Sequence, residues 1–235
     1  MFTGPIFAVA PDAAHGQGAT IPAVTRRLAL FTASAAALAA SVGLLAGPAA
    51  AAPSCKTAAQ PSPRATGGQK APKKSLDAKK AYDVTFETNC GSFTVRLDVK
   101  RAPNIAASIV SLVKAGFYNK TVFHRIVPGF VIQGGDPTAT GTGGPGYSVV
   151  DSPPKDLKYT LGLVAMAKTQ TEAPGTSGSQ FFVVTGQDVG LPPDYGLVGR
   201  VTKGLDVVQL IGTLGNAEQQ PTRIVQIVRA TVKNP

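Results

Sequence analysis

The chain has 235 residues and a formal net charge of +10, and its composition excludes several classes of protein. Two cysteines are too few for a disulfide-dense scaffold or a cysteine-cluster zinc site. The only two histidines, His15 and His124, exclude a metal site built from several histidines. Apolar residues make up 43% of the chain, which is enough for a sizeable core.

The basic excess is concentrated before residue 81. Residues 52–80 contain seven Lys or Arg residues and one Asp, whereas residues 81–235 contain 14 basic and 11 acidic residues. A nucleic-acid-binding domain would carry its basic excess on the folded part of the chain. We therefore expect no specific nucleic-acid binding, and at most weak contact between the basic segment and anionic polymers of a cell envelope.

Residues 1–51 have the order of features of an export signal. Arg26 and Arg27 precede an uncharged apolar run over 28–45, and small residues follow the run. This order is typical of a secretory signal peptide, and we predict cleavage after Ala51. The arginine pair also permits twin-arginine export. The sequence therefore predicts an exported, extracytoplasmic protein.

Two alternatives for this part of the chain are less favoured. The apolar run is Ala-rich and makes a poor permanent membrane anchor. A lipid anchor at Cys55 would need a large aliphatic residue three positions earlier, where Ala52 stands. Residues 1–23 fit no signal and are interpreted as an artefact of the assigned start site.

Residues 52–80 are rich in Pro, Ala and Lys and lack periodicity, so we predict a disordered basic tether. A disulfide from such a tether to Cys90 would stabilise little, because it would constrain a segment that stays mobile in the folded protein. We therefore predict that Cys90 is a free thiol.

From residue 81 onward, short runs that alternate apolar and polar residues predict strands. The hairpin 84–97 comes first, and further runs follow at 121–127, 130–134, 162–167, 180–185, 196–201 and 223–232. Apolar spacing predicts a helix that begins at Pro103 and ends before Gly116, and a second over 205–214. We predict one mainly β domain over 81–235, a closed eight-stranded antiparallel barrel capped by two α-helices.

Two apparent motifs carry no chemistry here. The stretch Gly141–Gly146 matches the letters of a dinucleotide-binding loop, but it contains Pro145 and is followed by a strand-like run where that motif needs a helix. His124, the only histidine of the domain, lies within an alternating strand and is interpreted as structural rather than as a catalytic base.

Three other stretches are informative together: 123–136 (FHRIVPGFVIQGGD), 178–183 (GSQFFV) and 197–201 (LVGRV). In order and spacing they closely resemble the cyclophilin family of peptidyl-prolyl cis-trans isomerases, which the chain resembles over the whole of 81–235. The family's fold is the barrel predicted above. We interpret the chain as an exported bacterial member that isomerises X–Pro bonds and assists the folding of exported proteins.

The resemblance implies the roles of individual residues. Arg125 would donate a hydrogen bond to the prolyl nitrogen, and Gln133 would hold Arg125 or the substrate backbone. The proline pocket would contain Phe130, Val131, Phe182, Leu191 and Tyr195. The groove for residues before the proline would contain Ala167, Lys168 and Gln180. The expected partners are proline-containing polypeptides bound by a monomer, with no cofactor and no metal.

The chain also departs from the best-known members. Gly190 stands where many have tryptophan, which argues against tight cyclosporin binding. Tyr195 replaces a common histidine and Lys168 a common asparagine. A non-catalytic proline-peptide binding module or envelope scaffold is the alternative function, but a pure binder would not need Arg125.

Overall fold

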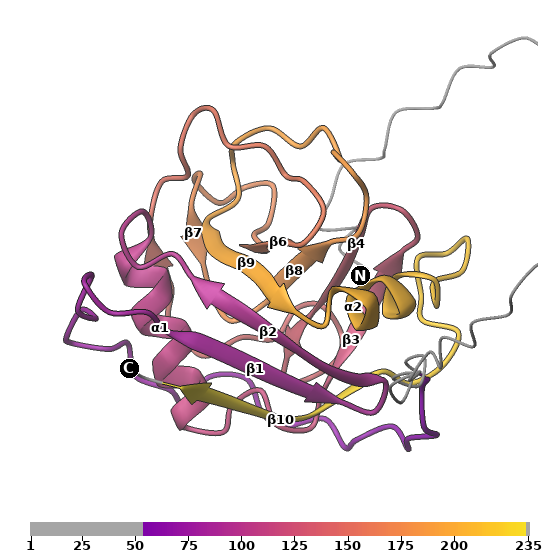
Figure 1. Ribbon diagram of the computed structural model, residues 1–235. Coiled ribbons are helices and arrows are strands. Elements are labelled where there is room, and N and C mark those ends of the chain that lie inside the picture. The colour runs from indigo at the N-terminus through magenta and orange to yellow at the C-terminus, as the bar shows by residue number, and fades with distance from the viewer. Residues whose placement is uncertain (1–53, 234–235) are drawn as a thin grey trace, which may run out of the picture. The chain divides into compact units, whose positions relative to one another are not determined.

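The structure of the protein is a computed structural model, which describes residues 54–233 (Figure 1). The predicted export signal over residues 1–51 lies outside the described residues. In the described part, no helix has the length and apolar character that crossing a membrane requires.

Eight strands form the predicted closed barrel, in the spatial order β1-β10-β3-β4-β8-β6-β9-β2. Every neighbouring pair is antiparallel. The strands are β1 (Asp83–Thr88), β2 (Gly91–Leu97), β3 (Thr121–Val127), β4 (Val131–Asp136), β6 (Leu163–Met166), β8 (Phe181–Val184), β9 (Leu197–Lys203) and β10 (Gln226–Lys233). A separate two-stranded sheet pairs β5 (Val149–Val150) with β7 (Thr176–Ser177).

The two predicted helices, α1 (Pro103–Lys114) and α2 (Leu205–Gly212), lie at opposite ends of the barrel (Figure 1). Proline at the first position of α1 fits a helix start, because its fixed φ is helical and its missing N–H would have no partner there. Apolar side chains on one face of each helix are buried, among them Ile109 of α1 and Ile211 of α2. The helices thus close the ends of the core.

Aromatic rings from four strands fill part of the barrel. The ring of Phe86 lies 5.2 Å from that of Phe93 and 5.0 Å from that of Phe181, and Phe123 lies 6.0 Å from Phe181. All four side chains are almost fully buried. Burial of these large aromatic side chains removes much apolar area from water and stabilises the fold. Because the rings come from strands that are far apart in the sequence, the cluster holds those strands together.

Residues 54–80, here called the arm, differ from the predicted tether. The arm contains no helix or strand, as its lack of periodicity predicts. It is nevertheless tied to the barrel by backbone hydrogen bonds, from Lys56 to Asn89, from Arg64 to Pro137 and from Gly67 to Gly144. The structure therefore gives this segment a defined path along the domain.

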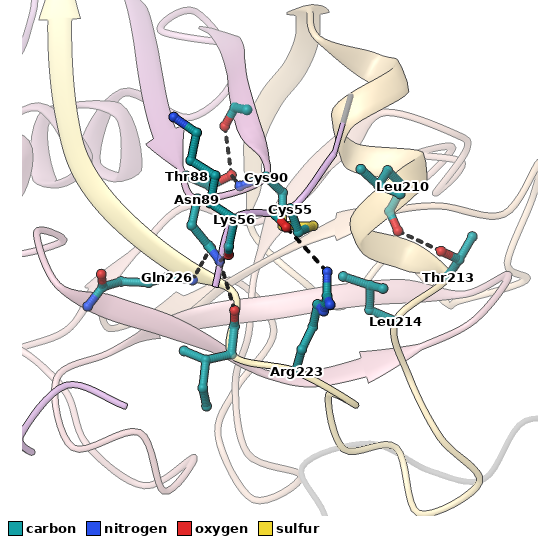
Figure 2. Close-up of a disulfide and its surroundings, with 12 residues drawn as sticks. Cys55, Lys56, Thr88, Asn89, Cys90, Leu210, Thr213, Leu214, Arg223 and Gln226 are labelled. Atoms are coloured by element: carbon teal, nitrogen blue, oxygen red, sulfur yellow. Dashed lines mark hydrogen bonds between the residues drawn. A yellow bond between two sulfur atoms is a disulfide. The ribbon is translucent and has the colours of Figure 1, made fainter. Parts of the chain in front are cut away.

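The prediction of a free Cys90 is wrong, because Cys55 and Cys90 form a disulfide (Figure 2). Beside it, the Lys56 N–H donates to the Asn89 carbonyl at 2.8 Å, and the Asn89 side-chain amide donates to the Lys56 carbonyl at 2.7 Å. The prediction rested on a mobile tether. In the structure the arm is instead hydrogen-bonded beside the hairpin turn, where Cys55 lies next to Cys90.

We expect reduction of this disulfide to lower the free energy of unfolding by about 2–4 kcal/mol, because the reduced unfolded chain regains conformational freedom. The measurement is thermal or denaturant unfolding with and without reductant. A variant with both Cys55→Ser and Cys90→Ser is the control. Its stability should equal that of the reduced protein and should not change when reductant is added. Equal stability of the oxidised and reduced proteins would contradict the prediction.

Candidate active site

Arg125 and Gln133 face each other across two neighbouring strands. Arg125 of β3 is the direct partner of Gln133 of β4, and directly opposed residues of antiparallel strands project from the same face. Val131 lies two residues before Gln133 in β4 and therefore shares that face. The pairing brings three of the predicted site residues together.

The guanidinium of Arg125 is held by a residue that the sequence analysis missed. Arg125 Nε donates to Gln219 Oε1 at 2.8 Å, and Gln219 lies in the loop between α2 and β10. Burial lowers the pKa of Arg125 to about 10, and the nearby Tyr195 opposes this shift. The guanidinium is therefore charged at neutral pH. No local motif marks Gln219, because its loop meets β3 only in the folded barrel.

Gln133 is fully buried and continues the polar network. Its Nε2 donates to Gln180 Oε1 at 3.1 Å. Among the described residues, Gln133 Oε1 has no hydrogen-bond partner. A buried acceptor without a partner is costly. This oxygen is thus suited to accept a hydrogen bond from the substrate backbone or from Arg125.

Phe181 and Phe182 face opposite sides of β8, as the alternation of a strand predicts. Phe181 packs in the core against Phe86, Phe123 and Tyr118. Phe182 instead has its ring 5.5 Å from that of Tyr195 and 6.1 Å from that of Tyr159.

The backbone of Tyr195 is clamped by Tyr159, a second residue that the sequence analysis missed. The Tyr159 hydroxyl donates to the Tyr195 carbonyl at 2.7 Å and accepts from the Tyr195 N–H at 3.0 Å. Burial raises the pKa of Tyr159 to about 12, so the hydroxyl keeps its proton. Burial, together with the Asp194 carboxylate, also raises the pKa of Tyr195, while the charge of Arg125 lowers it. Tyr195 therefore places a neutral phenol beside the Arg125 cation.

Lys168 is buried, with a side chain that is 4% exposed, and its ammonium is 2.7 Å from the Asp194 carboxylate. It also donates to the carbonyls of Thr169 and Glu172 and lies 5.7 Å from the centre of the Tyr195 ring. The ammonium is committed to these internal contacts. The Lys168 side chain therefore supports the wall that contains Tyr195.

The remaining predicted residues lie around this network. Phe130 is partly buried in the turn before β4, where its carbonyl accepts from the Thr185 N–H at 2.9 Å. Ala167 follows β6 and donates its N–H to the Gln180 carbonyl at 2.9 Å. Leu191 borders a hollow of about 350 Å³ together with Leu157 and Pro192, and no other predicted site residue lines that hollow.

A larger hollow of about 710 Å³ lies outside this set of residues, beside β2 and β9. Basic side chains line much of it, but Arg96 is paired with Asp83 and Arg101 with Asp98. None of its lining residues is aromatic, so it lacks the stacking platform of a single-strand nucleic-acid site.

His124 is not paired with a group that it could activate. Among the described residues, neither buried ring nitrogen has a side-chain hydrogen-bond partner. Burial also lowers the pKa of His124, which makes the imidazole a weaker base. The glycine-rich stretch 141–146 lies in the loop between β4 and β5, and a strand rather than a helix follows it. A nucleotide-binding loop needs that helix.

The closed barrel, the buried polar network and the aromatic wall together define a barrel protein with a fixed guanidinium beside an apolar site. The family model described as "Cyclophilin type peptidyl-prolyl cis-trans isomerase/CLD" matches residues 83–232. The chain is 41% identical to peptidyl-prolyl cis-trans isomerase-like 1 of Aspergillus oryzae, over 65% of this chain and 96% of that protein. Against the Bos taurus protein of the same name, the identity is 38% over 66% and 94% of the two chains.

Among solved structures, a cyclophilin type peptidyl-prolyl cis-trans isomerase of Cryptosporidium parvum, crystallised in the presence of the dipeptide Ala-Pro, has a TM-score of 0.60 and 29% identity. The match covers 64% of this chain and 98% of that one. The chain belongs to the cyclophilin-type peptidyl-prolyl cis-trans isomerase family. These relatives are eukaryotic, so they give no support to the expectation that this member is bacterial.

We expect Phe182→Ala to raise the KM for proline peptides at least ~10-fold, because the apolar contact area of a phenylalanine is lost. Phe181→Ala is the matched control: it should cost about 3–5 kcal/mol of stability and leave KM nearly unchanged. Steady-state kinetics and unfolding of both variants make the comparison. If Phe181→Ala alone changed KM, the assignment of the two faces would be reversed.

Proposed function

We propose that this protein catalyses the cis–trans isomerisation of X–Pro bonds in polypeptides outside the cytoplasm, and so assists their folding. The observation that carries the chemical part is the Arg125 guanidinium, which Gln219 orients beside the Phe182–Tyr195 wall. The dipeptide in the Cryptosporidium parvum crystals supports proline-containing peptides as the ligand class.

The reaction explains why these residue types are needed. Amide resonance makes isomerisation slow, with a barrier of about 18–20 kcal/mol. Catalysis therefore requires tighter binding of the twisted amide than of either planar isomer. Twisting gives the prolyl nitrogen a lone pair that can accept a hydrogen bond.

Arg125 is suited to donate that hydrogen bond, because it is charged, planar and carries several N–H groups. Its partial burial strengthens such a bond, since fewer water molecules compete for the donor. Gln219 fixes the plane of the guanidinium through Nε, and little reorganisation is then needed in the transition state. No bond is made or broken, and no cofactor takes part in this scheme.

We expect Arg125→Ala to lower kcat/KM at least ~10²-fold, as removal of a preorganised donor does in other enzymes. Arg125→Lys, which keeps the charge but loses the planar group of donors, should recover only part of the activity. A protease-coupled isomerase assay measures both variants, and circular dichroism checks that they fold. A fully active Arg125→Ala variant would remove this mechanism. If the wild-type protein bound proline peptides without accelerating isomerisation, a binding module would be the better description.

The extracytoplasmic part of the proposal rests on the Arg26–Arg27 and apolar pattern together with the Cys55–Cys90 disulfide. Stable disulfides are typical of oxidising compartments outside the cytosol. The proposal predicts that protein recovered from the medium or envelope of a host that recognises the signal begins at Ala52.

Mass spectrometry of the intact exported protein measures that N-terminus, and Arg26→Gln with Arg27→Gln is the variant that should block export. Recovery of the uncleaved chain from the cytosol, with both thiols reduced, would overturn the proposed location without affecting the enzymatic activity.

A further inference from the structure

The loop Pro137–Gly146, here called the glycine loop, borders the site and is held from its inner side by Asp136. The N–H groups of Thr138, Thr140 and Gly141 donate to the Asp136 carboxylate at 2.6–3.1 Å. Burial alone would raise the pKa of Asp136, but the hydrogen bonds from the loop lower it. The loop therefore closes around a charged carboxylate.

Two carbonyls of the glycine loop fix the side chain of Gln180. Gln180 Nε2 donates to the Gly141 carbonyl at 2.9 Å and to the Gly143 carbonyl at 3.0 Å. An amide nitrogen has two N–H donors, and both are used here. The Gln180 Oε1 is consequently turned toward Gln133 Nε2. A displaced loop would release this amide.

The arm holds the outer side of the same loop. Thr66 Oγ1 accepts from the Gly144 N–H at 2.9 Å and donates to the Gly144 carbonyl at 3.1 Å. The Gly67 N–H donates to the same carbonyl at 2.8 Å, and the Gln69 N–H donates to the Pro145 carbonyl at 3.0 Å. Four hydrogen bonds thus join a short stretch of arm to two loop residues.

The arm and the loop also approach too closely for side chains at one point. A Cβ on Gly146 would lie 2.8 Å from the Cα of Gly67. Both residues have a positive φ, +93° for Gly146 and +83° for Gly67, a conformation that glycine adopts without strain. Backbone packs directly on backbone here, and the position of the loop is coupled to that of the arm.

Two anchors keep the arm in this place. The Arg64 N–H donates to the Pro137 carbonyl at 2.9 Å, and its guanidinium donates to the Phe117 carbonyl. At the start of the arm, the Cys55–Cys90 disulfide is accompanied by a hydrogen bond from Arg223 to the Cys55 carbonyl at 3.3 Å (Figure 2).

We propose that the arm is a specificity-determining segment of the isomerase: Thr66 and Gly67 hold the glycine loop against Gln180 and so set the preference for the residues that precede the proline. The inference rests on the proposed function, in which Gln180 contributes to the groove for those residues. Thr66 acts through the loop and is a positioning residue. The role of Thr66 does not involve the N–H donors of the Arg125 guanidinium.

The test is Thr66→Val, which removes the hydroxyl and both of its hydrogen bonds to Gly144 while nearly keeping the side-chain volume. Thr57→Val is the matched control, because Thr57 is an exposed arm residue with no side-chain hydrogen bond among the described residues. The measurement is kcat/KM for X–Pro peptides that differ only at the second and third residues before the proline. Unfolding curves are recorded for each variant.

We expect Thr66→Val to change the ratio of kcat/KM between the best and the worst peptide by about 3–10-fold, the effect of one or two hydrogen bonds. Thr57→Val should leave that ratio unchanged. In a Gln180→Ala background, Thr66→Val should have no further effect on the ratio, because the residue through which it acts is absent. The variant with both Cys55→Ser and Cys90→Ser should change the ratio in the same direction as Thr66→Val.

The inference would be overturned if Thr66→Val left the ratio of kcat/KM between the best and the worst peptide unchanged. This includes the case in which kcat/KM falls by the same factor for every peptide. An additive effect of Thr66→Val in the Gln180→Ala background would also overturn it. In each of these cases the wild-type protein still accelerates isomerisation and the proposed function stands. A wild-type protein without isomerase activity on any peptide would instead contradict the proposed function itself.

Discussion

The pairing of β3 with β4 decides where the chemistry of this protein can take place. Val122 is paired with Asp136 and Arg125 with Gln133, but His124 and Gly135 are left out of the register between these pairs. One residue is skipped in each strand, so the two irregularities cancel. A one-residue slip without this compensation would turn Arg125 to the opposite face of the sheet from Gln133.

Position 135, within this pairing, requires glycine for both its backbone conformation and its close packing. Its φ is +87°, and a Cβ there would lie 2.6 Å from the Ser179 carbonyl oxygen. A larger residue would therefore push β4 away from the segment that leads into β8, and with it Gln133 away from Gln180. The glycines of the QGGD stretch thus serve the register and the close packing, while Arg125 and Gln133 supply the polar groups.

Packing and charge act together at the site. Tyr159 is fully buried, holds the backbone of Tyr195 from both sides and packs against Phe182. The Lys168–Asp194 pair lies beside the same tyrosine. Burial of an ion pair is costly unless the remaining polar atoms are satisfied, and Lys168 meets this condition through two carbonyls. The result is a stiff aromatic wall beside a single guanidinium.

The sequence by itself determined the barrel and its two helices, because strand alternation and helical spacing are local properties of the chain. The 123–136 motif also put Arg125 and Gln133 on two neighbouring strands, which the structure pairs, whereas the roles given to the site residues came from the family resemblance and stay predictions. The sequence could not identify Gln219 or Tyr159 as parts of the site, since each reaches it from a loop whose path depends on barrel closure. It also gave a wrong account of Cys90 and described the arm as a free tether. The sequence pattern shows only that the arm lacks periodicity, whereas its hydrogen bonds to Asn89 and Gly144 and its disulfide join it to residues that are distant in the sequence and lie beside it only in the folded domain.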